Sequence, residues 1–267
     1  MNDRKVLGLK KPVVGMIHTK ALPGTPNYKG SVKAVIDKAK KEAIVYKNTG
    51  IEVVMVENMH DVPYLKRSIG PEITYVMSIV GYEVKNETGL SCGIQILAGA
   101  NKEALASAHS AGLDFIRVEG FVFAHIADEG IIESGAGELL RYRKQIGAEN
   151  ILIFTDVKKK HSSHSITSDV SIVETAKAAE FFQSNGIIVT GATTGDPADP
   201  DDVIKVKEAT NLPVIIGSGI NLNNIKKYYE AGDAFIIGSY FKQGGYWKNE
   251  IDPDRVKSLV EKIKKGL

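Results

Sequence analysis

The chain has 267 residues, of which 43% are hydrophobic and 25% charged, a balance typical of a globular protein with a sizeable core. Its 34 lysine and arginine residues nearly match its 32 acidic residues, so a formal net charge of +2 excludes the strong overall field that recruits nucleic acid or an anionic membrane. The single cysteine, Cys92, excludes an internal disulfide and a multi-cysteine metal site.

Two features bear on where the protein resides. No apolar run approaches the roughly 20 residues that a helix needs to cross a bilayer. The N-terminus MNDRK is polar, and the apolar run VVGMI at 13–17 is too short for the core of a signal peptide. We therefore expect a cytoplasmic protein with no membrane partner.

Short apolar stretches rich in valine and isoleucine alternate with helical segments along the whole chain. We expect strands at 13–17, 51–56, 93–97, 115–118, 151–155, 187–189, 214–216 and 234–237. We expect helices at 31–48, 71–86, 102–110, 138–145, 171–183, 199–209, 223–230 and 253–265. Gly50 is expected to end the first helix, Asn101 to cap the third and Asp252 to cap the last, while Pro200 suits a first helical turn.

This alternation predicts the fold. Strands that alternate with helices form parallel βαβ units, and eight such units in series close into a barrel. We therefore expect an α/β protein with a (β/α)8 TIM barrel as a single domain over residues 1–267. An open doubly wound sheet is the alternative, and it is disfavoured because no G-x-G-x-x-G motif follows the first strand.

Gly-Ser pairs follow the last two expected strands, in VIIGSGI at 214–220 and AFIIGSYF at 234–241. Small residues there leave main-chain N–H groups open to a ligand, and a helix that starts after 221–224 would point its positive end at the same spot. In TIM barrels the loops after strands seven and eight bind phosphate in this way. The expected phosphate-binding residues are Gly217, Ser218, Gly219, Gly238, Ser239 and, from the TGATTG loop, Thr193. Alternatively, the glycines only permit tight turns.

The carboxyl ends of the strands form the functional face of such a barrel. Polar residues at these ends are the candidates for chemistry. They are His18, Glu57, Asn58, Gln95, Glu119, Asp156, Lys158, Lys160, His161, Thr190, Thr193, Ser218 and Ser239.

Three of the candidates are carboxylates at the ends of the second, fourth and fifth expected strands, namely Glu57, Glu119 and Asp156. They could share a divalent cation such as Mg²⁺, or divide the roles of acid and base. The alternative is that each pairs with a nearby lysine. The sequence leaves the presence of a metal open.

The basic loop DVKKKHSSH follows the fifth expected strand. If it is extended, Asp156, Lys158 and Lys160 share one face, where a lysine could neutralise a phosphate or act as a base or Schiff-base former. We expect Lys159 to be solvated. His161 lies in a serine-rich loop, where a zinc site is not expected but an acid–base role is plausible, as it is for His18.

Several long motifs resemble the BtpA/SgcQ family: GMIHTKALPGTP, VVMVEN, AGLDFIRVEG, GIIESGAGELLRYR, DVKKKHSSH, GIIVTGATTGDPAD, PVIIGSGI and GDAFIIGSYFK. The likeness extends from residue 13 to residue 260. It implies a TIM barrel akin to the ribulose-phosphate-binding barrels. By motif position it carries over a set of site residues. These are His18, Glu57, Asn58, Asp156, Lys160, His161, Gly217, Ser218, Gly219, Gly238 and Ser239.

The family is named after a cyanobacterial factor needed for photosystem I accumulation, whereas other members occur beside sugar-transport genes. This spread implies an ancestral role with small molecules. Two positions depart from the family pattern: Lys158 stands where a histidine is usual, and Glu119 stands where another polar residue is common. Both lie at the expected mouth, so we expect substrate or chemistry to differ from that of relatives.

We expect an enzyme that acts on a phosphorylated sugar or nucleotide-like metabolite by lyase, isomerase or nucleosidase chemistry. The Gly-Ser loops would bind phosphate, and the catalytic residues would be Asp156, Lys160, His161, Glu57 and His18. The alternative is a protein-assembly or stability factor without turnover, as the family name implies, and a ligand-sensing barrel is a third option. No nicotinamide or flavin motif is visible, although the same loops could hold a flavin phosphate. A homo-oligomer is also left open.

Overall fold

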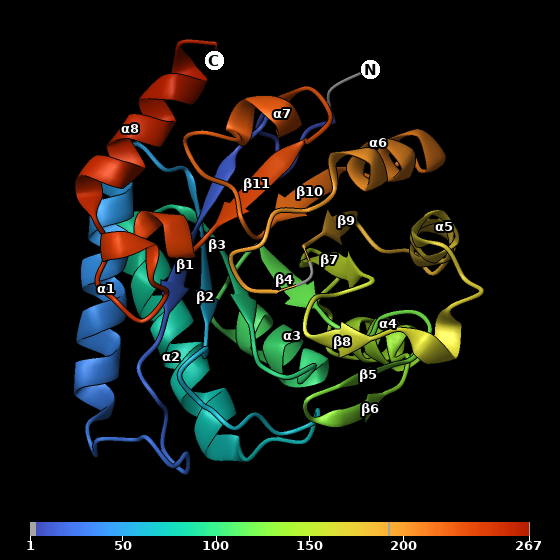
Figure 1. Cartoon of the computed structure of the whole chain (residues 1–267). Helices are drawn as coiled ribbons and strands as arrows, with labels where there is room; N and C mark the ends of the chain where they lie inside the picture. Colours follow the sequence, from blue (N-terminus) through green and yellow to red (C-terminus); the bar gives the residue numbers. More distant parts are fainter. Residues whose placement is uncertain (1–3, 192, 267) are drawn as a thin grey trace.

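The computed structural model describes residues 4–191 and 193–266. Within them, eight parallel strands close into a barrel with the neighbour order β1, β2, β3, β4, β7, β9, β10, β11 (Figure 1). Their bounds are β1 (Val13–His18), β2 (Val53–Glu57), β3 (Ser91–Gln95), β4 (Phe115–Val118), β7 (Leu152–Val157), β9 (Gly186–Val189), β10 (Val214–Gly217) and β11 (Ala234–Ile237). The ring closes because β11 pairs with β1, which confirms the predicted TIM barrel and excludes the open sheet.

A helix follows each barrel strand before the next one begins, and the helices lie around the outside of the barrel (Figure 1). They are α1 (Val32–Asn48), α2 (Pro71–Thr88), α3 (Asn101–Ser110), α4 (Ala136–Gln145), α5 (Ile172–Phe181), α6 (Pro200–Ala209), α7 (Ile225–Tyr229) and α8 (Pro253–Lys264). Within the described ranges, no helix has both the length and the apolar character to cross a membrane.

The predicted caps of these helices have mixed outcomes. The side chain of Asp252 accepts hydrogen bonds from the first N–H groups of α8, and Pro200 is the first residue of α6, both as predicted. The prediction for Asn101 is wrong. This residue is the first one inside α3, and its side-chain amide donates instead to the backbone carbonyl of Glu119 at 2.8 Å.

Alternation along the strands separates the interior of the barrel from its outer surface. Because side chains of a strand point alternately to opposite faces, every second residue enters the barrel. These inward residues form their own apolar cluster, apart from the larger cluster between strands and helices. The inner cluster comprises Val14, Met16, Val53, Met55, Phe115, Phe154, Ile188, Ile215, Ala234 and Ile236, together with Val6 from the segment before β1.

One step further along the same alternation, the inward positions become polar. Val14, Met16 and His18 follow one another at two-residue spacing on β1, and Glu57 and Arg117 continue the inner rows of β2 and β4 in the same way. The inner apolar cluster therefore fills the barrel toward the amino ends of its strands, and charged groups occupy the carboxyl end. This change of character places the polar residues at one mouth.

A small antiparallel sheet stands outside the barrel. It consists of β5 (His125–Ala127), β6 (Gly130–Ile132) and β8 (Ser162–Ser163), with the order β6-β5-β8. The sheet joins the loop after β4 to the loop after β7. The sequence pattern predicts no strand in either segment, and the sheet orders two mouth loops against each other.

Candidate active site

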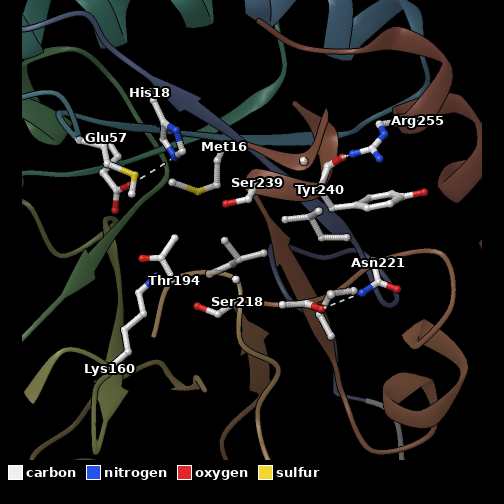
Figure 2. Close-up of a pocket in the computed structure, with 18 of the residues that line it drawn as sticks. Met16, His18, Glu57, Lys160, Thr194, Ser218, Asn221, Ser239, Tyr240 and Arg255 are labelled. Carbon is white, nitrogen blue, oxygen red and sulfur yellow. Dashed lines mark hydrogen bonds and ion pairs between the residues drawn. The ribbon is translucent and has the colours of Figure 1, made fainter. Parts of the chain in front are cut away.

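A cavity of about 540 Å³ opens at the carboxyl ends of the barrel strands (Figure 2). Residues from β1, β2 and β4 and from the loops after β7, β9, β10 and β11 line it. Predicted site residues among them are His18, Glu57, Lys160, Ser218, Gly219, Gly238 and Ser239. The structure therefore brings the expected phosphate loops and part of the expected acid–base set into one space.

The two Gly-Ser loops are neighbours because their strands pair, with Gly217 beside Ile236 in the register of β10 and β11. Ser218 has a left-handed backbone with φ of +73°, and Gly219 follows with φ of +64°. A Cβ atom on Gly219 would lie 2.2 Å from the backbone nitrogen of Pro197, so only glycine fits there. The Gly-Ser-Gly sequence thus reflects a close approach of two loops.

Asparagine side chains fix the first of these loops. The side-chain amides of Asn221 and Asn224 donate to the carbonyl oxygen of Gly219 at 3.2 and 2.8 Å. The Oδ1 atom of Asn221 in turn accepts from the backbone N–H groups of Asn223 and Asn224. These bonds hold the turn in place ahead of α7, so its shape is set before any ligand arrives.

Main-chain donors remain open in both loops. The N–H groups of Gly219, Ile220, Ser239 and Tyr240 form no hydrogen bond with any residue that the structure describes, and all four residues line the cavity. A 3₁₀ turn begins at Ser239, which leaves its first donors without an acceptor in the turn. Figure 2 shows the Ser218 and Ser239 side chains facing the cavity. Such clustered donors suit an anion.

His18 and Glu57 face each other beside these loops (Figure 2). The Nε2 atom of His18 lies 3.5 Å from Oε2 of Glu57, and its Nδ1 atom lies 3.4 Å from the carbonyl oxygen of Trp247. A carbonyl oxygen can only accept, so this contact puts the proton on Nδ1 and leaves Nε2 bare toward Glu57.

The protonation preferences of the pair agree with that geometry. Burial, followed by the charge of Lys242, lowers the pKa of His18 well below its usual range, so the imidazole is neutral. Burial raises the pKa of the Glu57 carboxyl, so it holds its proton to higher pH than an exposed glutamate. One proton can therefore pass between a carboxyl group and a bare ring nitrogen.

Lys160 reaches into the cavity from the loop after β7 (Figure 2). Its ammonium group forms no hydrogen bond or ion pair with the described residues. Burial, followed by the positive charge of Arg117, lowers the pKa of Lys160. The uncharged amine is therefore more accessible here than at the protein surface, as a base or nucleophile requires.

Arg117 is a cavity residue that the sequence interpretation missed. Its guanidinium donates to both carboxylate oxygens of Asp156, at 2.9 and 2.8 Å, and both side chains are buried. Asp156 does not line the cavity, and its two hydrogen bonds with Arg117 orient that guanidinium. The sequence could have identified Arg117, because two-residue alternation places it on the same side of its strand as Phe115 and Glu119.

The carboxylate of Glu119 also has hydrogen-bond partners within the protein. It accepts from Lys159 at 2.9 Å and from the Gln95 amide at 3.1 Å. The prediction of a solvated Lys159 is therefore wrong, since this side chain is only 9% exposed and its ion pair with Glu119 is buried. In residues 4–191 and 193–266, no cluster of three or more His, Cys, Asp or Glu side chains has the arrangement of a metal site.

The basic loop does not stay extended after β7. Lys158 and His161 have left-handed backbones with φ of +46° and +53°, and Lys158 donates away from the cavity to the carbonyl of Thr167 at 2.8 Å. The prediction that Asp156, Lys158 and Lys160 share one face is therefore wrong. Of the three, only Lys160 lines the cavity.

Several other candidates serve the loops around the cavity. His161 is exposed and accepts from the backbone N–H of Thr194 at 3.0 Å, which ties two mouth loops together. Thr193 is exposed, and its hydroxyl donates a hydrogen bond to Asp196. Its neighbour Thr194 lines the cavity, whereas Thr193 does not. Thr190 accepts from the backbone N–H of Lys160 at 3.2 Å.

Asn58 lies away from the cavity. It is fully buried and bridges the β2 end to its surroundings, since its amide donates to Asp61 and its oxygen accepts from the backbone of Leu97, both at 2.8 Å. Further cavity residues were not singled out from the sequence, because nothing in their local letters marks them. They include Met16, Met59, Ile236, Tyr240 and Arg255.

The fold is shared with solved phosphate-metabolising enzymes. The structure of (S)-3-O-geranylgeranylglyceryl phosphate synthase from Thermoplasma acidophilum matches with a TM-score of 0.59 and 17% identity, covering 98% of this chain and 99% of that one. Orotidine 5'-phosphate decarboxylase from Pyrococcus horikoshii matches with a TM-score of 0.59 and 14% identity, over 94% and 99% of the two chains. At these identities the likeness shows the barrel fold alone.

Sequence relatives are much closer. An uncharacterized mitochondrial protein of Caenorhabditis elegans is 49% identical over 97% of this chain and 95% of its own length. The photosystem I biogenesis protein BtpA of Synechocystis sp. is 33% identical, over 96% of this chain and 89% of its own length. The model of the BtpA family matches residues 9–265. The chain therefore belongs to the BtpA family.

Proposed function

We propose that this protein is an enzyme that transfers protons on a phosphorylated small metabolite at the carboxyl end of its barrel. One observation carries the proposal. A single cavity combines open main-chain N–H groups of two Gly-Ser loops with a carboxyl–imidazole pair and a lysine that has no ion-pair partner among the described residues. An anion site and an acid–base set in one space are what such an enzyme needs.

The phosphate would bind at Gly217, Ser218, Gly219, Gly238 and Ser239. Of these, Gly217 does not line the cavity, and the open N–H donors that would contact the dianion are those of Gly219, Ile220, Ser239 and Tyr240. They complement a dianion without adding a fixed positive charge. The cavity of about 540 Å³ lies within the usual range for small-molecule sites and exceeds what a phosphate alone would fill. The remaining volume extends toward Glu57 and Lys160, which suits a sugar phosphate or a nucleotide-like metabolite.

Proton transfer would occur at the other end of the cavity. Glu57, protonated and beside the bare nitrogen of His18, is the proposed acid. Lys160, as a neutral amine, is the proposed base, and it could also add to a carbonyl carbon. Asp156 would act through Arg117, and His161 would act by ordering the mouth loops. Isomerase, lyase and nucleosidase reactions all need such a donor and acceptor.

The matched structures lend support of a general kind. Their names specify a phosphate synthase, crystallised with sn-glycerol-1-phosphate, and a decarboxylase of a 5'-phosphate. In TIM barrels the loops after the last two strands commonly hold the phosphate group of such ligands. The two Gly-Ser loops of this chain occupy that position.

An assembly or stability factor for photosystem I is the second candidate, and the name of the Synechocystis relative favours it. The nematode relative is more similar to this chain and comes from an organism without photosystems. This distribution favours a small-molecule role that does not depend on photosynthesis. The enzyme proposal requires a ligand at the mouth, whereas the assembly proposal requires a partner protein on the surface.

A thermal-shift screen against phosphorylated metabolites, with and without Mg²⁺, tests the enzyme proposal. We expect phosphate esters to raise the melting temperature of the wild type but not of Ser218→Asp, which puts a negative charge at the anion site. Ser171→Asp is the matched control, because Ser171 caps α5 outside the cavity and aspartate caps helices equally well. If no phosphate ester stabilises the wild type while a partner protein is captured, the assembly role replaces the enzyme.

The compartment and the oligomeric state belong to the proposal as well. We propose a cytoplasmic protein, although the nematode relative is named as mitochondrial. Fractionation of cells that express the native chain would decide between the two compartments. Light scattering at known concentration would show whether copies of the chain associate.

A further inference from the structure

A second cavity of about 440 Å³ lies outside the barrel mouth. The loop between β1 and α1, the first turns of α1, the loop after β2 and the segment around Trp247 enclose it. Its lining residues are Lys20, Ala21, Asn27, Tyr28, Lys29, Ser31, Ala34, Val35, His60, Val62, Trp247 and Lys248. It shares none of these residues with the cavity of the proposed active site.

Flat and apolar groups form its walls. Trp247 is the only tryptophan of the chain, and its ring centroid lies 5.0 Å from that of His60. Ala21 and Val35 add aliphatic surface, and Tyr28 adds a second aromatic ring. Such walls favour a planar ring, because aromatic faces pack well against one another.

Positive charges without acidic counterparts surround the opening. Lys20, Lys29 and Lys248 are exposed, and none of the described residues that line the cavity is an aspartate or a glutamate. None of the three forms an ion pair with the residues that the structure describes, and the ammonium of Lys248 lies 5.1 Å from the centre of the Trp247 ring. A cavity of this charge attracts anions and repels cations.

One segment separates the two cavities. Gly245 lines the cavity of the active site, whereas Trp247 and Lys248 line the second one. The carbonyl of Trp247 is also the group that faces Nδ1 of His18. A ligand against the Trp247 ring would therefore contact the residue whose carbonyl faces His18, without entering the active-site cavity.

We propose that this second cavity binds a small molecule that combines a planar aromatic ring with one anionic group. The ring would lie against Trp247 and Tyr28, and the anion would meet Lys29 and Lys248. Neither the acid–base set nor the Gly-Ser loops take part, so the site is additional to the proposed function. An aromatic carboxylate and a nucleoside monophosphate share this chemistry.

Fluorescence of Trp247 reports on the site directly, since no other tryptophan contributes. Benzoate is compared with uncharged benzamide, and AMP with uncharged adenosine. We expect saturable quenching by at least one of the two anions, and much weaker quenching by its uncharged analogue. Which anion binds identifies the source, and quenching should weaken as salt rises.

Variants locate the binding. The double variant Lys29→Ala/Lys248→Ala should weaken binding about tenfold, as expected for two exposed ion pairs. Lys177→Ala, an exposed lysine on α5, is the control and should bind like the wild type. Ser218→Asp should also bind normally, because it blocks only the phosphate loops, so this proposal can fail or hold independently of the proposed function.

Three outcomes would overturn the inference. The first is the absence of quenching by both anions. The second is equal quenching in the double lysine variant and the wild type. The third is loss of quenching in Ser218→Asp, which would place the anion in the active-site cavity instead.

Discussion

Charged side chains at the barrel mouth are of two kinds. Arg117 with Asp156 forms one buried matched pair, and Lys159 with Glu119 forms another. Lys160 has no ion-pair partner in the described part of the chain, and Glu57 faces a neutral imidazole. A matched pair has its charges fixed by mutual attraction, whereas an unmatched group can change protonation at low cost. We therefore propose chemistry for the unmatched groups and positioning for the pairs.

Glu57→Gln should remove the proposed proton donor while keeping its size and its hydrogen-bonding oxygen. We expect kcat on a metabolite found in the screen to fall about 10²–10⁴-fold. The stabilisation of the protein by phosphate esters should persist, because the Gly-Ser loops are untouched. Glu52→Gln is the control, since Glu52 is exposed at the opposite end of β2. Unchanged turnover in Glu57→Gln would remove Glu57 from the chemistry.

Arg117→Met should destabilise the fold because it leaves the Asp156 carboxylate buried without a partner. The expected loss in the free energy of unfolding is about 3–5 kcal/mol. The double variant Arg117→Met/Asp156→Leu should recover a large part of this loss, since it removes both charges together. Urea unfolding measures both values. Equal losses in the single and double variants would contradict the assignment of a matched pair.

At the scale of elements, two short loops define the proposed anion site through backbone shape. The turn at Ser218 and Gly219 is left-handed, passes close to Pro197 and is held by two asparagine side chains. Because the donors are main-chain N–H groups, their direction depends on the loop path. The site is therefore sensitive to backbone changes that leave every side chain charge in place.

Gly219→Ala should distort this path, because its Cβ atom would meet the backbone at Pro197. We expect stabilisation by phosphate esters to be lost and the free energy of unfolding to fall by more than the roughly 1–2 kcal/mol of a left-handed alanine. Gly147→Ala is the matched control, with φ of +71° and no atom within 4 Å of a new Cβ. The control should show the backbone cost alone and retain ligand binding. Retained binding in Gly219→Ala would argue against this loop as the anion site.

Elements with strong local signals were predictable from the sequence. The valine- and isoleucine-rich runs placed all eight barrel strands, and the cap at Asp252 was correct. The third strand begins earlier than predicted, because Ser91 and Cys92 pair with β2 although neither residue favours a strand by itself. The small sheet of β5, β6 and β8 was missed, since its strands are very short and depend on one another.

At the scale of the molecule, the barrel and the polar mouth at its carboxyl end follow from the strand pattern. Parallel strands bring all their carboxyl ends to one rim, so the sequence could predict that Glu57, Lys160, Ser218 and Ser239 meet. It could not predict which lysine pairs with Glu119. Lys159 and Lys160 are adjacent in the chain, and only the left-handed turns around them decide which one enters the cavity. Such turns are set by contacts between loops that are distant in sequence.

The fold also buries histidines in neutral form, which has a consequence for the stability of the whole molecule. Burial lowers the pKa of His18, His60, His125 and His164, and that of His125 falls from 6.5 to about 4. As the pH falls below 6.5, the unfolded chain takes up protons on these residues before the folded chain does. The contribution of these histidines to the free energy of unfolding is therefore complete above pH 6.5. It should decrease as the pH drops toward about 4.

Urea unfolding at about pH 7 and about pH 5 tests this dependence through single variants. Each fully buried histidine should contribute a slope of about 1.4 kcal/mol per pH unit within its window. His125→Gln should therefore lose less stability than the wild type between the two pH values, and so should His18→Gln. Glu57 has the opposite effect, because its pKa in the folded protein lies above the usual value. Its protonation therefore stabilises the folded state as the pH falls. The slope of the wild type is thus smaller than the sum over histidines. Ser110→Ala, at the exposed end of α3, removes no group that titrates in this range and should keep the pH slope of the wild type. If His125→Gln and His18→Gln also kept the slope of the wild type, the loss of stability in acid would have to arise from groups other than these two histidines.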